Sequence, residues 1–460
     1  MNTITQLSSR REFLRQSALL AGSAVVSANA FGQVQIGKKT KVIIIGGGFA
    51  GLAAAYALRK KNVDVTVLES RNRLGGRVFS HIVDPAQNLT VELGAEWVGN
   101  SHIRMRELCD EFKLELLNNQ FDTHLIYKNQ YAKSTDWDFS DDWKGKFKVL
   151  LKQYQTMSEQ DKLHLDQMDW WRYLVNNGCE GKDLILRELL DSTDFGESIR
   201  HVSAFIALAT FAESSEKNEM DLKIKNGNGE LARKLAEKIG QEHIHTGHKV
   251  TKIEQKNNVI VHCENGQTFE ADKLICAIPT FAIKNIQWEP GLPDEKIRAL
   301  NELQYARINK NALLFEKRFW QDENFDMITD QVPHYFYHAT KNQPSTKGVL
   351  ISYTIGEKAE LVSNQNDAWR KEMIHQTLNP FFGDVRGMIE SQANYYWGTD
   401  SLSQGAYAMY GINQWHTTRP ALQKPFLNTH FAGEHLADWQ GFMEGALVSG
   451  EAAALEVTAS

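Results

Sequence analysis

Short apolar runs and longer amphipathic stretches alternate along residues 41–460. Lys41–Ile45 is rich in β-branched residues and has no polar position after its lysine, which is typical of a strand buried on both faces of a parallel sheet. The small and apolar residues of Leu52–Leu58 predict a helix, and Val63–Leu68 predicts a second strand. This strand–helix–strand order predicts an α/β fold with a parallel sheet.

The same alternation returns in the second half of the chain. The sequence Asn-Gly-Asn-Gly at 226–229 predicts a turn before a helix over Glu230–Ile239, which Gly240 is suited to end. Strands are then predicted at 250–253, 259–263 and 274–279, with a hairpin turn at Asn265-Gly266.

The stretch 98–225 predicts mainly helix and carries no readable motif. Its four tryptophans suit a packed core and the wall of a cavity equally well: Trp137, Trp143, Trp170 and Trp171. The pattern therefore leaves their role open.

Composition and charge exclude several classes of protein. The 460 residues are 42% hydrophobic and 23% charged, as in globular proteins, and the length favours two or three domains. A formal net charge of −6 argues against nucleic acid as a partner. The four cysteines lie far apart without CxxC spacing, so we expect neither a disulfide framework nor a metal site.

The first thirty residues predict an export signal. Arg10 and Arg11 precede an apolar stretch at 18–26, and Ala-Asn-Ala at 28–30 suits cleavage. The apolar stretch is far shorter than the roughly 20 residues that span a bilayer, so we expect no stable membrane insertion. The arginine pair predicts a bacterial protein that the twin-arginine export machinery moves, already folded, to the periplasm or the medium. Such a route suits a protein that binds its cofactor tightly before export.

A glycine turn after the first strand predicts a dinucleotide site. Gly46, Gly48 and Gly51 have GxGxxG spacing, which allows a tight turn, close approach of backbone to a pyrophosphate, and close packing of helix on strand. The helix N-terminus would point its N–H groups at the phosphates. Glu69 ends the second strand, where a carboxylate can accept hydrogen bonds from a ribose. These features fit NAD and FAD alike.

Further segments carry a resemblance to one family. Arg71–Arg77 continues from Glu69 and contains Arg-x-Gly-Gly-Arg, Gly94–Trp97 reads Gly-Ala-Glu-Trp, and His430–Glu434 and Trp439–Ala446 stand near the C-terminus. With the glycine turn, these segments resemble the FAD-dependent amine oxidase family, which includes monoamine, polyamine and L-amino-acid oxidases. The resemblance covers essentially the whole chain after residue 30, and it implies FAD rather than NAD.

The resemblance implies an α/β protein with a Rossmann-like FAD-binding domain built from the discontinuous segments 38–97, 226–290 and 400–460. A mixed α+β substrate-binding domain with a helical part would occupy 98–225 and 291–399. The FAD contacts that it implies are Gly46, Gly48, Phe49, Ala50, Gly51, Glu69, Ser70, Arg77, Gly94, Ala95, Glu96, Trp97, Val250, Gly433, Glu434, Gly441, Phe442 and Met443.

The resemblance also implies residues for catalysis and for substrate binding. Lys310 lies on a predicted strand and would sit above flavin N5 through a bridging water, where it would assist reoxidation by O2. Tyr407 and Phe442 would flank the amine as two walls of an aromatic cage. Trp97 would lie beside the substrate.

Three positions depart from relatives in that family. Phe442 stands where mammalian monoamine oxidases carry the second tyrosine of the cage, so the cage lacks one polar group. Ala406 stands where mammalian monoamine oxidases carry the cysteine that bonds the flavin, so we expect non-covalent FAD. Trp97 stands where vertebrate L-amino-acid oxidases place an arginine that clamps the substrate carboxylate, which favours amines without a carboxylate. Arg104, Arg106 and Arg307 remain alternatives for such a clamp.

The resulting hypothesis is an exported amine oxidase that converts a primary or secondary amine to an imine and reduces O2 to hydrogen peroxide. Within the family, the alternatives are an L-amino-acid oxidase and a flavin dehydrogenase with another electron acceptor. A flavin-binding protein without catalysis and an enzyme of C–C desaturation are more distant alternatives. The partners expected are a small amine or amino acid and O2, and the oligomeric state stays open, with a homodimer as one option.

Overall fold

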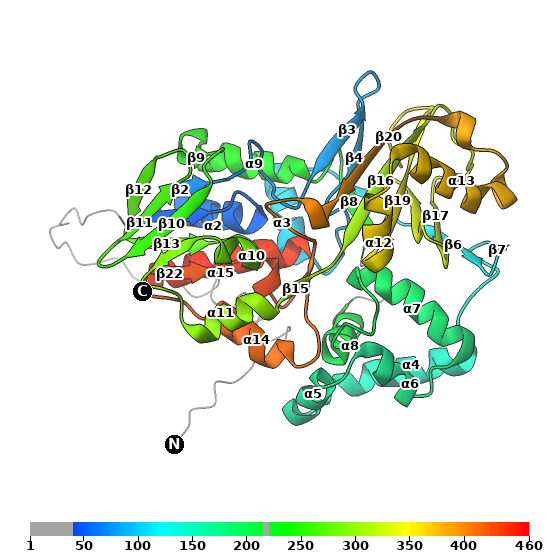
Figure 1. Cartoon of the computed structure of the whole chain (residues 1–460), viewed down its shortest axis with the longest axis horizontal. Coiled ribbons are helices and arrows are strands. Elements are labelled where there is room, and N and C mark those ends of the chain that lie inside the picture. Colours follow the sequence, from blue (N-terminus) through cyan, green and yellow to red (C-terminus); the bar gives the residue numbers. More distant parts are fainter. Residues whose placement is uncertain (1–39, 215–219, 460) are drawn as a thin grey trace. The chain divides into compact units, whose positions relative to one another are not determined.

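The computed structural model describes residues 40–214 and 220–459, so the predicted export signal lies outside the described residues. The parallel sheet with its helices lies at the left of Figure 1, and a larger sheet lies at the right. In the described part of the chain, no helix is both long and apolar enough to cross a membrane.

The predicted parallel sheet is present, and distant parts of the chain supply its strands. All four pairings are parallel, and the central strand is buried from Val42 to Ile45. The order across the sheet is β22 (Thr429–Phe431), β13 (Lys273–Cys276), β1 (Lys41–Ile45), β2 (Asp64–Leu68) and β9 (Ile244–His245). The inner strands β1 and β13 are continuous apolar runs after their first lysine, as expected of a sheet covered on both faces.

Two helices that begin near the carboxyl end of this sheet cross at close range. A Cβ placed on Gly450 would lie 2.0 Å from the Ala50 carbonyl oxygen, so only glycine permits this approach. Four helices share one apolar core with the sheet: α2 (Phe49–Lys60), α3 (Ile103–Phe112), α9 (Gly229–Ile239) and α15 (Met443–Ala459). Helix α9 ends at Ile239, and Gly240 caps it as predicted. Helix α3 thus packs with the parallel sheet, although its sequence falls in the stretch that we assigned to the substrate domain.

A second, four-stranded sheet follows α9 and contains the strands predicted at 250–253 and 259–263 with their hairpin, whereas the strand predicted at 274–279 is β13 of the parallel sheet and ends at Cys276. Its order is β12 (Thr268–Ala271), β11 (Val259–Cys263), β10 (Val250–Gln255) and β14 (Gln287–Glu289). Three two-stranded pairs complete the smaller sheets: β3 (Ser80–Asp84) with β4 (Leu89–Glu92), β5 (Leu116–Asn118) with β8 (Leu222–Ile224), and β15 (Gln304–Tyr305) with β21 (Ala408–Met409).

The large sheet has seven strands, and it includes two from the stretch that predicted mainly helix. The order is β20 (Ile389–Tyr396), β16 (Ile308–Phe315), β19 (Gly348–Ile355), β18 (Tyr335–His338), β17 (Phe325–Thr329), β6 (Asp122–Tyr127) and β7 (Gln130–Ala132). Strand β6 pairs in parallel with β17 on one side and antiparallel with β7 on the other. The prediction of mainly helix over 98–225 was therefore wrong for residues 116–132.

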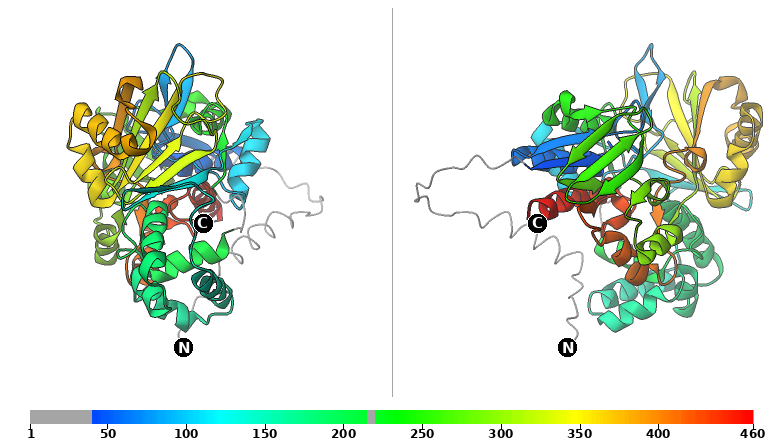
Figure 2. Two further views of the ribbon diagram at one scale, coloured as in Figure 1. Left: turned by 90° about the vertical axis from the view of Figure 1, so that its right-hand side faces the viewer. Right: turned by 60° about the vertical axis from the view of Figure 1, so that its left-hand side comes forward.

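The predicted helical part is present after β7, grouped beneath the large sheet in Figures 1 and 2. It consists of α4 (Asp141–Tyr154), α5 (Glu159–Asp166), α6 (Trp170–Asn176), α7 (Gly181–Phe195) and α8 (Ala204–Glu213). Trp143 and Trp170 are almost fully buried in its core. The remaining helices are α10 (Thr280–Lys284), α11 (Asp294–Glu302), α12 (Gly356–Ser363), α13 (Asp367–Phe382) and α14 (Gln414–Gln423).

Candidate active site

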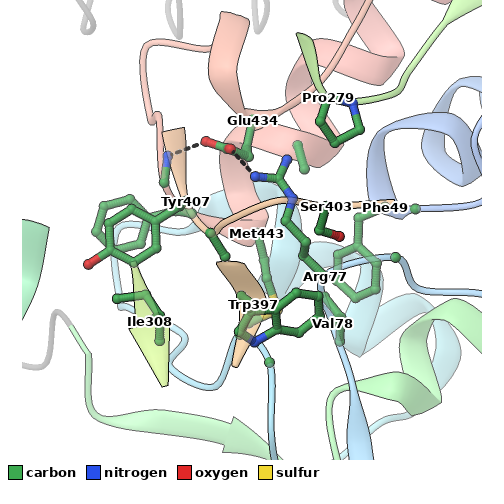
Figure 3. Close-up of a pocket in the computed structure, with 18 of the residues that line it drawn as sticks. Phe49, Arg77, Val78, Pro279, Ile308, Trp397, Ser403, Tyr407, Glu434 and Met443 are labelled. Carbon is green, nitrogen blue, oxygen red and sulfur yellow. Dashed lines mark hydrogen bonds and ion pairs between the residues drawn. The ribbon is translucent and has the colours of Figure 1, made fainter. Parts of the chain in front are cut away.

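A cavity of about 940 Å³ runs from the glycine turn after β1 to strands β16, β17, β18 and β19. Figure 3 shows part of its wall, where Arg77, Glu434 and Tyr407 come from three different segments. The predicted site residues in the wall are Gly46, Gly48, Phe49, Ala50, Glu69, Ser70, Arg77, Gly94, Ala95, Glu96, Trp97, Val250, Lys310, Tyr407, Gly433, Glu434, Gly441, Phe442 and Met443. Gly51 lies behind the glycine turn and does not line the cavity.

The three glycines of the turn meet three different steric demands. Gly46 has a φ of +107°, a backbone conformation that residues other than glycine rarely adopt. A Cβ on Gly51 would lie 1.9 Å from the Gly46 carbonyl oxygen, so glycine lets the helix pack on the strand. A Cβ on Gly48 would meet nothing closer than 4.0 Å, because this position faces open space in the cavity. Backbone here is thus open to a pyrophosphate, and the turn fits a dinucleotide.

Two helix N-termini open on the same cavity. Phe49 and Ala50 at the start of α2, and Met443 at the start of α15, belong to its wall. The unpaired N–H groups of a first helical turn attract negative charge. The site therefore offers one N-terminus to a phosphate and a second to an electron-rich ring, as FAD would present.

Arg77 and Glu434 form an ion pair at the centre of this end of the cavity (Figure 3). The Glu434 carboxylate accepts from Arg77 at 2.6 Å, from the Ala408 N–H at 3.0 Å and from the Gly441 N–H at 2.7 Å. Burial acts to raise the pKa of Glu434, but Arg77 and these donors outweigh it, and the pKa is lowered. The ionised carboxylate joins three segments of the wall and orients the guanidinium.

Glu69 is held in a similar way. Its carboxylate accepts from the Gly47 N–H at 2.6 Å and from the Arg71 N–H at 2.7 Å, and the residue is buried. Because each carboxylate oxygen has more than one lone pair, Glu69 can still accept from a ribose hydroxyl. Glu69 therefore stabilises the glycine turn through its hydrogen bonds and also lines the cavity.

Lys310 reaches the cavity wall from the middle of β16. Its side chain is 3% exposed, and its ammonium donates to the carbonyls of Glu92 and Gly94 at 3.0 and 2.9 Å and to the Glu96 carboxylate at 3.3 Å. Burial lowers the pKa of Lys310, and the charge of Glu96 opposes that effect. Lys310 lies on a fully buried strand, as predicted, and this strand ends at Phe315.

Glu96 connects Lys310 to two further polar groups. The Tyr337 hydroxyl donates to the same carboxylate oxygen, and the Lys223 ammonium lies 3.7 Å from the other oxygen. The Trp97 ring lies 5.2 Å from the Lys310 nitrogen and packs at 5.3 Å from the Tyr337 ring. A buried network of acid, amine and hydroxyl therefore stands beside the aromatic wall.

The two predicted cage residues have different neighbours. The Tyr407 hydroxyl donates to the Asp194 carbonyl, and its ring covers Gly441, whose Cβ would lie 3.1 Å from it. The Phe442 ring packs against His102 at 5.1 Å and against Trp439 at 5.5 Å. Both rings line one cavity, but Tyr407 turns toward α7 and Phe442 toward α3.

Sequence reasoning missed most of the residues at this far end. They come from segments without a motif: α7, strands β17 to β19, β6 with the residues before it, and the residue before β8. The wall there contains Asn119, Phe121, Thr123, Leu190, Thr193, Asp194, Asp221, Asp326, Ile328, Tyr335 and Tyr353. The four tryptophans of the 98–225 stretch, whose role the sequence did not decide, do not line this cavity. They pack elsewhere in the described part of the chain.

None of the three arginines considered as a carboxylate clamp lines the cavity. Arg104 pairs with Glu451, Arg307 pairs with Glu197, and Arg106 is exposed. Within the described part of the chain, the only arginines in the wall are Arg71 and Arg77.

The described residues also contain no group of acidic, histidine or cysteine side chains that could hold a metal ion. The four cysteines are all buried, and none lines the cavity.

Comparisons with known proteins agree with this geometry. The family model of flavin containing amine oxidoreductases matches residues 49–458. The chain is 25% identical to the flavin-containing amine oxidase A of Canis lupus familiaris, over 90% of this chain and 84% of that protein. It is 26% identical to polyamine oxidase 2 of Arabidopsis thaliana, over 93% and 90%. The structure of putrescine oxidase bound to putrescine matches with a TM-score of 0.81 at 21% identity, covering 92% of this chain and 100% of that one, which shows a shared fold.

Proposed function

Because the chain belongs to the family of flavin-containing amine oxidoreductases, we propose that it oxidises amines without a carboxylate and uses O2 as the electron acceptor. The observation that carries this proposal is the cavity itself, which joins the dinucleotide turn to a tyrosine-rich and acidic chamber with no free arginine. In the net reaction, an amine R–CH2–NH2, O2 and water give an aldehyde, ammonia and hydrogen peroxide.

FAD bound through the glycine turn, Glu69, Arg77 and the two helix N-termini would supply the two-electron acceptor for the C–N bond. The chain's own groups bind and orient the amine. Tyr407 and Phe442 present ring faces to it, and the buried wall excludes water, so a neutral amine is favoured over an ammonium at this point. Lys310 is the lysine of β16, and its buried ammonium group lies in the cavity wall, where it can hold or transfer a proton.

Non-covalent binding of the cofactor is part of the proposal. Ala406 lines the cavity where a thiol would be needed, and no cysteine reaches the wall. A visible spectrum of the purified protein before and after heat precipitation tests this expectation. Flavin should stay in solution, and yellow protein in the pellet would contradict it.

Peroxide release from a panel of amines and L-amino acids tests the activity. We expect peroxide with amines and little with amino acids, because the described wall contains the carboxyl groups of Asp194, Asp221 and Asp326 and no unpaired cation. Comparable rates with an L-amino acid would favour the oxidative deamination of amino acids instead. Reduced flavin without peroxide would identify a dehydrogenase.

We also propose export by the twin-arginine route, on the evidence of Arg10, Arg11 and the apolar stretch that follows. Cell fractionation of a bacterial host should find the processed chain outside the cytoplasm. Replacement of both arginines by lysine should retain the unprocessed chain inside. Export of that variant at the normal level would contradict the assignment.

A further inference from the structure

We propose that the far end of the cavity is a subsite for a second ammonium group, formed by Asp194, Asp326 and Asn119. The substrate would then be an α,ω-diamine or polyamine, with one amine at Tyr407 and the other at this subsite. The inference rests on the proposed function, since it names which amines the site accepts.

Asp194 supplies an unpaired carboxylate at the end of α7. It lines the cavity, and no described residue makes a hydrogen bond or an ion pair with its carboxylate. The nearest acid on the same helix face, Asp191, already pairs with Arg187 at 3.3 Å and accepts from Trp170 at 2.7 Å. Burial raises the pKa of Asp194 to about 8, which is the mark of a carboxylate placed without a counter-ion.

Asp326 and Asn119 add buried polar atoms that lack partners. One oxygen of Asp326 accepts from Tyr335 at 2.6 Å and from Thr123 at 3.1 Å, while the other has no partner. Asn119 is fully buried, and no described residue forms a hydrogen bond with its side-chain oxygen or nitrogen. Because nearly all buried polar groups are hydrogen-bonded, several such atoms in one cavity wall point to a ligand that satisfies them.

The charges of the wall select a cation. Each lysine or arginine in the described wall already has a carboxylate partner: Arg71 with Asp400, Arg77 with Glu434, Lys249 with Glu264 and Lys310 with Glu96. Asp221 adds a further half-buried carboxylate to the same wall. A substrate carboxylate would therefore find no free cation among the described residues of the wall. An ammonium would find carboxyl oxygens that accept its hydrogen bonds, and its charge would favour their ionised form.

A row of tyrosines links the two ends. Tyr353 lies within hydrogen-bonding reach of Tyr407, and its ring meets the Tyr335 ring edge-on at 6.4 Å. Tyr335 in turn donates to Asp326. Ring faces of this kind suit a methylene chain, which buries apolar surface between two charged ends.

The test compares 1,4-diaminobutane with butylamine, which lacks only the second ammonium. In the holoenzyme, kcat/KM should be far higher for the diamine, and Asp194→Asn should lower it for the diamine by roughly 30-fold or more while butylamine changes little. Asp110→Asn, which removes an exposed carboxylate on α3, is the matched control and should change neither amine. Unchanged flavin content and a melting temperature no lower than that of the parent would show that the variant folds.

Binding gives a second measurement. Under nitrogen, 1,4-diaminobutane should raise the melting temperature of the holoenzyme more than butylamine does, and Asp194→Asn should remove that difference. Equal kcat/KM for the two amines, or a parallel loss of both in Asp194→Asn, would overturn the subsite and leave amine oxidation intact. Absence of flavin reduction by every amine would instead overturn the proposed function.

Discussion

The nucleotide end and the far end of the cavity differ in how their polar groups are satisfied. At the nucleotide end, Glu69 and Glu434 each accept hydrogen bonds from backbone amides, and Arg77 is paired. At the far end, no described residue makes a hydrogen bond or an ion pair with the side chain of Asp194 or Asn119. The first end is preorganised by the chain, and the second is left for groups that a ligand brings. Substitutions at the two ends should therefore fail in different ways.

The largest effect is expected at the glycine turn. Gly51→Ala would place a methyl group 1.9 Å from the Gly46 carbonyl oxygen, so helix α2 must move off β1. We expect a loss of about 3 kcal/mol or more in unfolding free energy, or no folded protein. Gly48→Ala is the matched control, because its methyl group enters open space. It should fold normally but bind FAD more weakly, as measured by flavin content and titration of the apoprotein. Normal flavin affinity in Gly48→Ala would show that the backbone there does not approach the cofactor.

The next effect is expected at the ion pair that joins three segments. Arg77→Met would leave the buried Glu434 carboxylate without its cation, which typically costs about 3–5 kcal/mol. Urea unfolding of the holoprotein measures this loss. The double replacement with Glu434→Gln should recover part of it, and an equal or greater loss in the double variant would contradict the pairing account.

A smaller effect is expected at the boundary between the two ends. Lys310→Met should slow flavin reoxidation by O2 by about 100-fold, equivalent to ~2.7 kcal/mol, while flavin reduction by substrate changes far less. Stopped-flow measurement of the two half-reactions separates them. Lys223→Met, at the other oxygen of Glu96, is the control and should affect reoxidation less. Equal oxygen reactivity in Lys310→Met would remove its assigned role.

The smallest effect is expected at the far end and depends on pH. Because the pKa of Asp194 is about 8 when folded and near 3.8 when unfolded, the folded state keeps a proton that the unfolded state has lost between these values. Unfolding free energy therefore falls as pH rises from about 4 to 8. Asp194→Asn should be more stable than the parent by about 1–3 kcal/mol at pH 8 and equal at pH 4, by thermal unfolding. A gain that does not depend on pH would show that Asp194 is ionised in the fold.

The nucleotide end could be predicted from the sequence because its demands are local. A tight turn needs Gly46, a helix packed on a strand needs Gly51, and an acid at a strand end needs only the strand before it. These constraints act between neighbours in the chain, so their residue types appear at fixed spacing. The parallel sheet followed in the same way from its continuous apolar runs.

The rest was decided by tertiary contacts. Residues 122–127 became a strand because an edge of the large sheet was available for pairing, and the sequence carries no sign of that edge. Asp194 and Asp326 lie on an ordinary helix and an ordinary strand, and only packing turned both toward one cavity. The sequence by itself thus determined the cofactor turn and the family resemblance, through local geometry that few residues satisfy. The tertiary structure alone decided which charges face the substrate, since burial and pairing arise between segments far apart in the chain.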